Sequence, residues 1–303
     1  MNLETLQYFL YIAKYKNITK AAKHFYISQS TLSRNIMALE EELKARLFER
    51  HHKQLELTEA GKVFEQECAL LMKHMEIILH NVQVADQGNT GVLRITSPGN
   101  LCQTLSDSLT LFHQEHPSIE LIVETYDFNE IPSAVQYNLY QIGFTYDFAA
   151  AGYDDLERIS IGADDFAIVV SSSLFPKPTP KSISGIVESL PLILPSHIEP
   201  PFMKLMIHEL QSYSGIRKIT PTYVNNTDSA MLKASLGLGY SIVPISLTKS
   251  TSGEGGIAYI PLEDFSAKST IVMLYKKEFA SELVLSYVDT VKSLCAESSC
   301  TFQ

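Results

Sequence analysis

The sequence lacks the features that mark most membrane, secreted and metal-binding proteins. No run approaches the roughly 18 consecutive apolar residues of a transmembrane helix. The start, MNLETLQYFL, has neither the basic region nor the cleavage site of a signal peptide. Its cysteines, Cys68, Cys102, Cys295 and Cys300, show no CxxC or Cys/His metal spacing. These absences predict a cytoplasmic protein with free thiols, no metal site and no membrane partner.

Common enzyme signatures are also absent. The chain contains no GxSxG nucleophile turn, no P-loop and no GxGxxG dinucleotide motif. Ser196 and His197 are adjacent, but nothing beside them suggests an oxyanion hole. We therefore expect no catalytic residues and no cofactor, and a hydrolase that uses this Ser/His pair remains a distant alternative.

Positive charge is scarce, but it is unevenly placed. Residues 1–58 carry nine Lys or Arg and six Asp or Glu, a net charge of +3, whereas residues 59–303 carry fifteen and twenty-eight, a net charge of −13. A mildly basic head on an acidic body is typical of a DNA-binding domain joined to a part that does not touch DNA. Because the head is only weakly basic, two or more heads are expected to bind together.

The segment from Asn17 to Phe48 contains the most informative pattern. Thr19 is expected to cap a short helix that carries Ala21, Ala22 and Phe25. After a break, Ser28 caps a longer helix with one buried stripe, made by Leu32, Ile36, Leu39 and Leu43. Two helices, a short turn and a polar face on the second helix form a helix-turn-helix. In this motif the second helix enters the major groove of double-stranded DNA.

The residues expected to contact DNA lie on the N-terminal turns of that second helix and on a following hairpin. Gln suits adenine, and Arg suits guanine or a phosphate. The hairpin, FERHHKQLELT, carries cations at its tip and predicts the wing of a winged helix. The predicted DNA contacts are Ser28, Gln29, Ser30, Thr31, Ser33, Arg34, Arg50 and Lys53. A zinc site at His51-His52 is disfavoured, because adjacent residues are poorly placed to bind one ion together.

This stretch resembles the N-terminal signature of LysR-type transcriptional regulators. The resemblance rests on SQSTLSR (Ser28 to Arg34), with Ala21-Ala22, Leu39-Glu40, Leu57-Thr58 and Ala60-Gly61 in register. Lys44 departs from the pattern, because the family usually has Gly there, and Gly would serve as a left-handed C-terminal cap. The resemblance implies binding to a promoter with dyad symmetry and a partnership with RNA polymerase.

A long helix is expected next, from Thr58 to about Gln87. Its apolar seam follows heptad spacing, which favours pairing with a second copy, although packing on its own body remains an alternative. The seam consists of Phe64, Cys68, Leu71, Met75, Ile78 and Val82. The expected homo-oligomer is a dimer, and the resemblance adds a tetramer. Residues 88–91, rich in Gly and polar residues, form a predicted hinge.

From Gly91 onward, strands and helices alternate, which predicts a largely parallel sheet with helices on both faces. Two such runs resemble the effector domain of the same family, which is related in fold to type 2 periplasmic binding proteins. The expected fold is α plus α/β: a winged helix-turn-helix (1–58), a linker helix (59–87), a hinge (88–91) and a two-lobed body (92–303). Lobe one would comprise 92–161 and 268–303, and lobe two 162–267.

Polar turns at the carboxyl ends of strands predict an effector site between the lobes, because ligands of open α/β sheets bind there, often at helix N-termini. The alternative is that these residues are plain caps and turns. The predicted site comprises Ser97, Gly99, Asn100, Leu101, Cys102, Tyr126, Thr145, Ser196, His197, Phe202, Asn225 and Thr227. The family resemblance points to the same places, with Ser97, Asn100, Thr145 and Ser196 nearest to the usual effector contacts.

The chemistry of these turns limits the effector. They contain no Lys or Arg, so a dianion would be poorly neutralised, and a small monocarboxylate or a neutral polar molecule is favoured. A thiol sensor at Cys102 is disfavoured, because Cys68, its nearest cysteine in the sequence, belongs to the linker helix. The sequence therefore predicts a LysR-type regulator controlled by a small molecule, with a non-specific architectural DNA-binding protein as the alternative.

Overall fold

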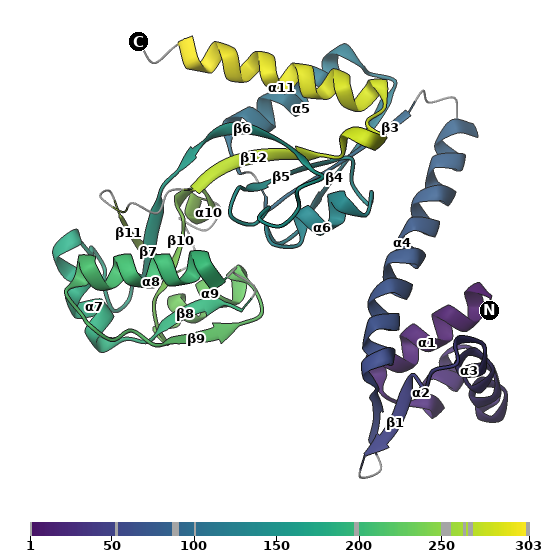
Figure 1. Ribbon diagram of the computed structural model, residues 1–303. Coiled ribbons are helices and arrows are strands. Elements are labelled where there is room, and N and C mark those ends of the chain that lie inside the picture. Colours follow the sequence, from purple (N-terminus) through teal and green to yellow (C-terminus); the bar gives the residue numbers. More distant parts are fainter. Residues whose placement is uncertain are drawn as a thin grey trace. The chain divides into compact units, whose positions relative to one another are not determined.

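The computed structural model describes residues 2–51, 54–86, 91–99, 101–196, 200–249, 256–262, 265 and 269–300. The chain divides into two compact units, Met1–Gln83 and Val84–Gln303 (Figure 1). Within the described ranges, no helix is long and apolar enough to cross a membrane.

The first unit is a winged helix-turn-helix followed by a long helix. Its elements are α1 (Leu3–Tyr15), α2 (Ile18–His24), α3 (Gln29–Leu43), β1 (Phe48–His51), β2 (Gln54–Leu57) and α4 (Glu59–Asp86). β1 and β2 pair antiparallel as a hairpin. One core joins the helices, and it contains Leu6, Phe9, Ile12, Ala21, Leu32, Ile36 and Leu39. The stripe expected on the second helix of the motif is thus buried against α1 and α2.

Two helix ends of this unit bear on the expectations from the sequence. Asn17, not Thr19, caps α2, because its side chain accepts the backbone N–H of Lys20 at 2.8 Å. Lys44 ends α3 in the left-handed conformation, with φ 51°, so it takes the backbone position that a Gly would occupy more easily. The helix therefore ends where the family pattern ends it, despite the departure in sequence.

The first lobe of the second unit is built on a five-stranded sheet with the order β4-β3-β5-β12-β6. Its strands are β3 (Gly91–Ser97), β4 (Ile119–Thr125), β5 (Ile142–Tyr146), β6 (Glu157–Asp164) and β12 (Ser269–Tyr275). α5 (Gln103–Glu115) and α11 (Glu282–Cys300) cover one face, and α6 (Ile131–Gln136) covers the other (Figure 1). Gly143 permits the close packing of α6, because a Cβ there would lie 2.6 Å from the Ile131 side chain.

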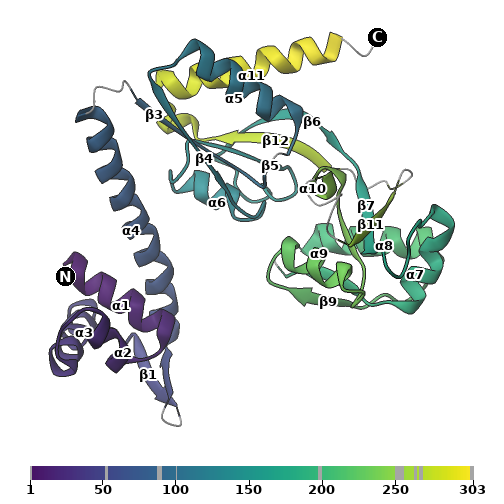
Figure 2. The same ribbon diagram turned by 180° about the vertical axis from the view of Figure 1, so that it is seen from behind.

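The prediction of a largely parallel sheet is only partly correct. β3 runs parallel to β4 and β5, but β12 runs antiparallel to both β5 and β6. The reason is the chain path: β6 leads out of the first lobe, and β12 returns to it from the second (Figure 2). β6, which leaves the first lobe, and β12, which returns to it, therefore pair antiparallel.

The second lobe contains two smaller sheets. β7 (Phe166–Ser171) lies between β10 (Ser241–Pro244) and β11 (Ile257–Pro261), antiparallel to both, while β8 (Leu192–Pro195) and β9 (Pro221–Val224) are parallel. The helices are α7 (Ile183–Ser189), α8 (Pro200–Ser214), α9 (Thr227–Ser235) and α10 (Ile245–Lys249). Their shared core includes Phe166, Ile168, Val170, Ile186, Leu194, Leu210 and Tyr240.

Short helical turns complete the fold. The 3-10 helices are η1 (Pro180–Ser182), before α7, and η2 (Lys277–Phe279), before α11. The sequence analysis did not predict α7, α10 or β11. The predicted hinge at 88–91 lies outside the described residues except for Gly91, which begins β3.

Candidate functional site

The exposed face of α3 carries a cluster of hydroxyl groups at its start. Ser28 Oγ accepts the backbone N–H of Thr31 at 3.1 Å and thereby caps the helix. The same oxygen lies 2.8 Å from the hydroxyl of Ser30 and 2.8 Å from that of Thr31. Because Leu32 on the opposite side is fully buried, the helix is held in one rotation about its axis. The hydroxyl cluster therefore faces solvent in a defined orientation.

Gln29 is held by a residue of the preceding helix. Thr19 Oγ1, on α2, donates a hydrogen bond to Gln29 Oε1 over 3.2 Å. Gln29 and Arg34 are exposed, and Ser33 is partly buried. The sequence analysis treated Thr19 only as a helix cap, and the ten-residue separation gave no signal of this contact. The two helices of the motif together fix the direction in which the Gln29 amide points.

The hairpin places the other predicted DNA contacts beyond this helix. Arg50 lies in β1, opposite Leu55 of β2. His52 and Lys53 lie outside the described residues. Where the structure describes the chain, it contains no group of three or more His, Cys, Asp or Glu side chains that could hold a metal ion.

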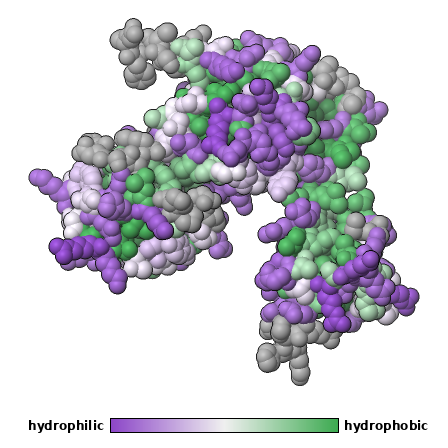
Figure 3. All heavy atoms as spheres, in the orientation of Figure 1, coloured by the Kyte–Doolittle hydropathy of each residue, from purple (hydrophilic) through white to green (hydrophobic). Residues whose placement is uncertain are grey.

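The apolar seam of α4 has two parts. Phe64 and Cys68 pack against the core of the first unit, where Cys68 is buried. Beyond them Leu71, Ile78 and Val82 are exposed by 48%, 54% and 64%. Hydrophobic residues accordingly gather along the surface of this helix in Figure 3. Only the second part of the seam is therefore free to contact another chain.

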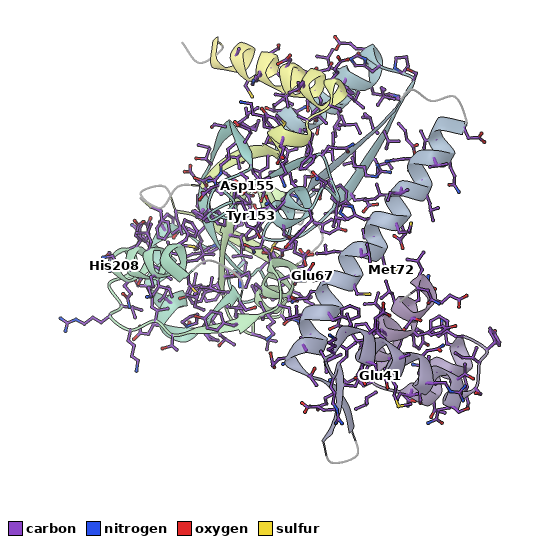
Figure 4. All side chains as sticks on the ribbon, turned by 45° about the vertical axis from the view of Figure 1, so that its right-hand side comes forward. Glu41, Glu67, Met72, Tyr153, Asp155 and His208 are labelled. Atoms are coloured by element: carbon purple, nitrogen blue, oxygen red, sulfur yellow. The ribbon has the colours of Figure 1, made fainter. Side chains whose placement is uncertain are left out.

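A neighbouring residue shows how α4 is fixed at its base. Met72 packs against the core of the first unit, and in Figure 4 it lies on the side of α4 toward α1, whereas Glu67 lies on the other side. Thr58 Oγ1 accepts the backbone N–H of Gly61 at 2.9 Å and donates to the carbonyl of Arg46. The start of α4 is thus capped and packed, as the sequence predicted for Thr58.

The second unit contains a cavity of about 330 Å³ between its two lobes. The first lobe contributes residues at and after the ends of β3 and β4, and the second lobe contributes the N-terminal turns of α9 and one residue of α10. The first-lobe lining is Pro98, Thr125, Tyr126, Asp127, Phe128 and Glu130. The second-lobe lining is Asn226, Thr227, Asp228, Met231 and Leu247. The cavity therefore lies at the carboxyl ends of strands, where the sequence analysis expected a ligand.

A hydrogen bond between the lobes borders this cavity. The backbone N–H of Thr227, at the start of α9, donates to Asp127 Oδ2 at 3.3 Å. Asp127 Oδ1 also accepts the backbone N–H and the side-chain N–H of Asn129, each at 3.2 Å. The backbone N–H of Thr227, one of the predicted effector residues, thus already has a carboxylate of the protein itself as its partner. Sequence reasoning missed Asp127, although its place two residues after the end of β4 was a usable signal.

Thr227 has a second feature that concerns ligand binding. The residue is only 6% exposed and lines the cavity. Its Oγ1 is buried and has no hydrogen-bond partner among the described residues. A buried hydroxyl without a partner costs stability unless another group satisfies it.

Several predicted effector residues serve the protein's own structure. Ser97 is buried, and its hydroxyl donates to the carbonyl of Gly99 at 2.6 Å. Thr145 is also buried, and its hydroxyl donates to the carbonyl of Phe128 at 2.8 Å. Leu101 belongs to the first-lobe core. These contacts shape the cavity wall through Pro98 and Phe128, which do line it.

The remaining predicted residues lie in different places. Cys102 precedes α5 and packs against the first-lobe core, where burial raises the pKa of its thiol. Ser196 and Asn225 are exposed, and Tyr126 lines the cavity. Asn100 and His197 lie outside the described residues. Of the predicted set, the described part of the cavity wall brings together Tyr126 and Thr227.

Phe202, predicted as part of the effector site, is not in the described lining of the cavity and instead joins the two lobes. Its ring stacks on that of Phe148, and Phe148 in turn stacks on Tyr146. The Tyr146 hydroxyl lies 2.7 Å from Ser246 Oγ, which donates to buried Asp164 at 2.6 Å. Burial raises the pKa of Tyr146, so its hydroxyl stays protonated. These residues form a connection between the lobes and do not belong to the described lining of the cavity.

Comparisons with known proteins agree with this architecture. A family model described as the bacterial regulatory helix-turn-helix protein of the lysR family matches residues 3–62, and the LysR substrate binding domain matches residues 86–296. The transcriptional regulator BudR of Raoultella terrigena is 24% identical over 298 residues, which cover 95% of this chain and 99% of BudR. CatR of Pseudomonas putida is 26% identical over 289 residues, which cover 94% of this chain and 96% of CatR.

Solved structures show the same fold. The crystal structure of CbnR, a LysR family transcriptional regulator, matches with a TM-score of 0.71 at 22% identity, covering 97% of this chain and 99% of CbnR. Full-length CbnR in complex with its target DNA matches with a TM-score of 0.68 at 23% identity, covering 97% and 99%. The fold expected from the sequence is confirmed. Because the two family models together cover nearly the whole chain, the protein belongs to the LysR family of DNA-binding transcriptional regulators.

Proposed function

We propose that this regulator binds a dyad-symmetric promoter site as a dimer or tetramer, and that a small-molecule effector between the lobes controls this binding. The observation that carries the proposal is the exposed start of α3, where the hydroxyl cluster, Gln29 and Arg34 share one oriented polar face. Side chains on the N-terminal turns of such a helix reach base edges in the major groove. The structure of full-length CbnR in complex with its target DNA shows a protein of similar fold bound to DNA.

Each part of the chain would have its own role in this function. Residues 1–58 would bind DNA, residues 59–87 would pair two copies, residues 88–91 would act as a hinge, and residues 92–303 would hold the effector. Arg50 and Lys53 of the wing would contact phosphates. At the promoter, the assembly would act on RNA polymerase in the cytoplasm. The proposal includes no catalytic step.

Promoter binding by Arg34→Ala tests the proposal directly. The promoter fragment is the region upstream of the gene next to the regulator's own gene, and random DNA of equal length is the reference. Binding to both is measured over a series of salt concentrations. A regulator needs a large specificity ratio between them, whereas an architectural protein shows a small one. We expect Arg34→Ala to lower promoter affinity by about 1–3 kcal/mol.

The matched control is Arg217→Ala, which removes the same charge from an exposed position of the body. It should leave promoter binding unchanged. If folded Arg34→Ala binds the promoter as the wild type does, α3 is not the reading helix. Equal affinity of the wild type for promoter and random DNA would favour the architectural alternative.

A further inference from the structure

The described wall of the inter-lobe cavity is acidic. Asp127 and Glu130 line it from the first lobe, and Asp228 lines it from the second. No Lys, Arg or His belongs to this described lining. A carboxylate ligand in such a cavity would meet like charges, which disfavour the bound state. The predicted turns lack Lys and Arg, and the described lining adds three carboxylates, so the cavity disfavours an anionic ligand.

One usual compensation for an anion, a helix N-terminus, is already partly engaged in this part of the wall. A helix N-terminus attracts anions through its free N–H groups. At α9, however, the Thr227 N–H already donates to Asp127, and the Asn226 side chain accepts the N–H of Ser229 at 2.9 Å. An anionic ligand that bonds to the Thr227 N–H would have to displace the carboxylate of Asp127. A cation would instead be attracted by the carboxylates of the wall.

Thr227 Oγ1 supplies an independent sign of a ligand. It is buried at the cavity wall, and no described residue satisfies it. A hydroxyl oxygen accepts hydrogen bonds from N–H groups, so an ammonium group could bond to it and to a carboxylate together. A metal ion fits less well, because no three side chains of the described chain are grouped to ligate one.

The rest of the lining suits a small organic molecule. Tyr126, Phe128, Met231 and Leu247 give apolar and aromatic surface beside the carboxylates. Aromatic faces attract cations as well as hydrocarbon. The cavity volume of about 330 Å³ lies at the small end of ligand sites in proteins, roughly 300–1,000 Å³.

We propose that the inter-lobe cavity binds a small organic cation, held by Thr227 Oγ1 and by the acidic lining that Asp127, Glu130 and Asp228 provide. This assignment rests on the proposed function, because it names the chemical class of the effector. It replaces the monocarboxylate or neutral molecule that the predicted turns favoured. The apolar lining holds the hydrocarbon part of the ligand.

Three four-carbon probes that differ mainly in charge test the assignment on the full-length chain. They are 1,4-diaminobutane, 1,4-butanediol and succinate, each titrated at one ionic strength by calorimetry and by thermal shift. We expect diaminobutane to bind at least about tenfold more tightly than butanediol, as one charge-assisted hydrogen bond would give. Succinate should give neither heat nor a rise in melting temperature.

Variants locate the binding. Asp228→Asn and Glu130→Gln should each weaken diaminobutane binding, whereas Glu188→Gln, the same change at an exposed position of α7, should not. Thr227→Val should weaken binding without lowering the melting temperature of the free protein, because the hydroxyl it removes has no partner there. A purely structural Thr227 would instead lower that temperature.

The outcomes separate this assignment from the proposed function. Tighter binding of succinate or butanediol, or binding of none of the probes, overturns the cationic assignment. So does diaminobutane binding that all three cavity variants leave unchanged. Promoter binding measured on the same preparation tests the regulator itself, so loss of specific promoter binding in folded protein overturns the proposed function.

Discussion

Phe148 and Phe202 stack face to face, with ring centroids 4.3 Å apart and planes inclined by only 5°. Phe148 belongs to the connection after β5, and Phe202 lies on α8 of the second lobe. Phe148 packs against the cores of both lobes. The pair therefore forms an apolar contact between the two lobes. A ligand in the cavity would have to hold the same two lobes in one arrangement.

Phe148→Ala should destabilise the body. The free energy of unfolding should fall by about 3 kcal/mol, because the variant removes a large apolar side chain that both cores contact. Urea unfolding followed by circular dichroism measures this change. Phe148→Leu is the control that keeps most of the volume, and it should cost only about 1 kcal/mol, the size of an aromatic pair. A Phe148→Leu variant as stable as the wild type would show that the stacking contributes nothing beyond the apolar volume.

Thr19→Val should reduce sequence discrimination while leaving the fold intact. The variant keeps the shape of the side chain but removes the hydroxyl that donates to Gln29 Oε1. We expect a smaller loss than for Gln29→Ala, which should cost about 1–3 kcal/mol at one base position. Binding to a set of single-base promoter variants measures both losses.

The double variant decides whether Thr19 acts through Gln29. If it does, Thr19→Val has no further effect once Gln29 is Ala. An equal effect of Thr19→Val in both backgrounds would mean that Thr19 contacts DNA on its own.

Leu71→Asp combined with Ile78→Asp should convert oligomers to monomers. Both side chains are about half exposed on α4, so the variant leaves the core of the first unit untouched. Two carboxylates in an apolar pairing surface would be desolvated without partners. Sedimentation velocity at several protein concentrations measures the result.

The matched control adds the same charge elsewhere on α4. Gln66→Asp with Gln83→Asp places two carboxylates on exposed positions that are not three or four residues from any seam residue. This control should sediment as the wild type does. If the Leu71/Ile78 variant also keeps the wild-type mass, α4 does not pair through this seam.

The sequence predicted the DNA-binding unit in more detail than the cavity. The Ser28 cap and the buried stripe of α3 depend on residues three or four positions apart, so local rules suffice. Asp127 and Thr227 are a hundred residues apart and meet only because two lobes fold together. The antiparallel placement of β12 likewise depends on the return of the chain from the second lobe. Such contacts leave no periodic signal in the sequence.

Cys68 should make the stability of the first unit depend on pH in the alkaline range. Burial raises the pKa of its thiol from 9.0 to about 11, because the thiolate would be desolvated in the core. A raised folded-state pKa stabilises the protein below the unfolded value. That stabilisation is lost as the pH rises from about 9 to about 11, and it amounts to at most about 2–3 kcal/mol.

Urea unfolding of the wild type and of Cys68→Ala at several pH values isolates this effect. Tyr and Lys residues also titrate there, but they are common to both proteins. The difference between the two unfolding free energies should therefore shrink as the pH rises. A difference that stays constant from pH 8 to pH 11 would show that Cys68 is not buried as described.

Lys44→Gly should stabilise the DNA-binding unit. Lys44 adopts φ 51° at the end of α3, and its backbone N–H bonds to the carbonyls of Glu40 and Glu41. A side chain in the left-handed region costs about 1–2 kcal/mol, and Gly avoids this cost. Part of the gain is offset by the greater freedom of Gly in the unfolded chain, so we expect a net gain of about 1 kcal/mol. Hydrogen exchange of the α3 amide protons measures this gain, because these amides become exposed to exchange when the unit unfolds. Lys44→Ala, which keeps a Cβ, should give no gain, and equal protection in the Gly and Ala variants would mean that the left-handed backbone carries no strain.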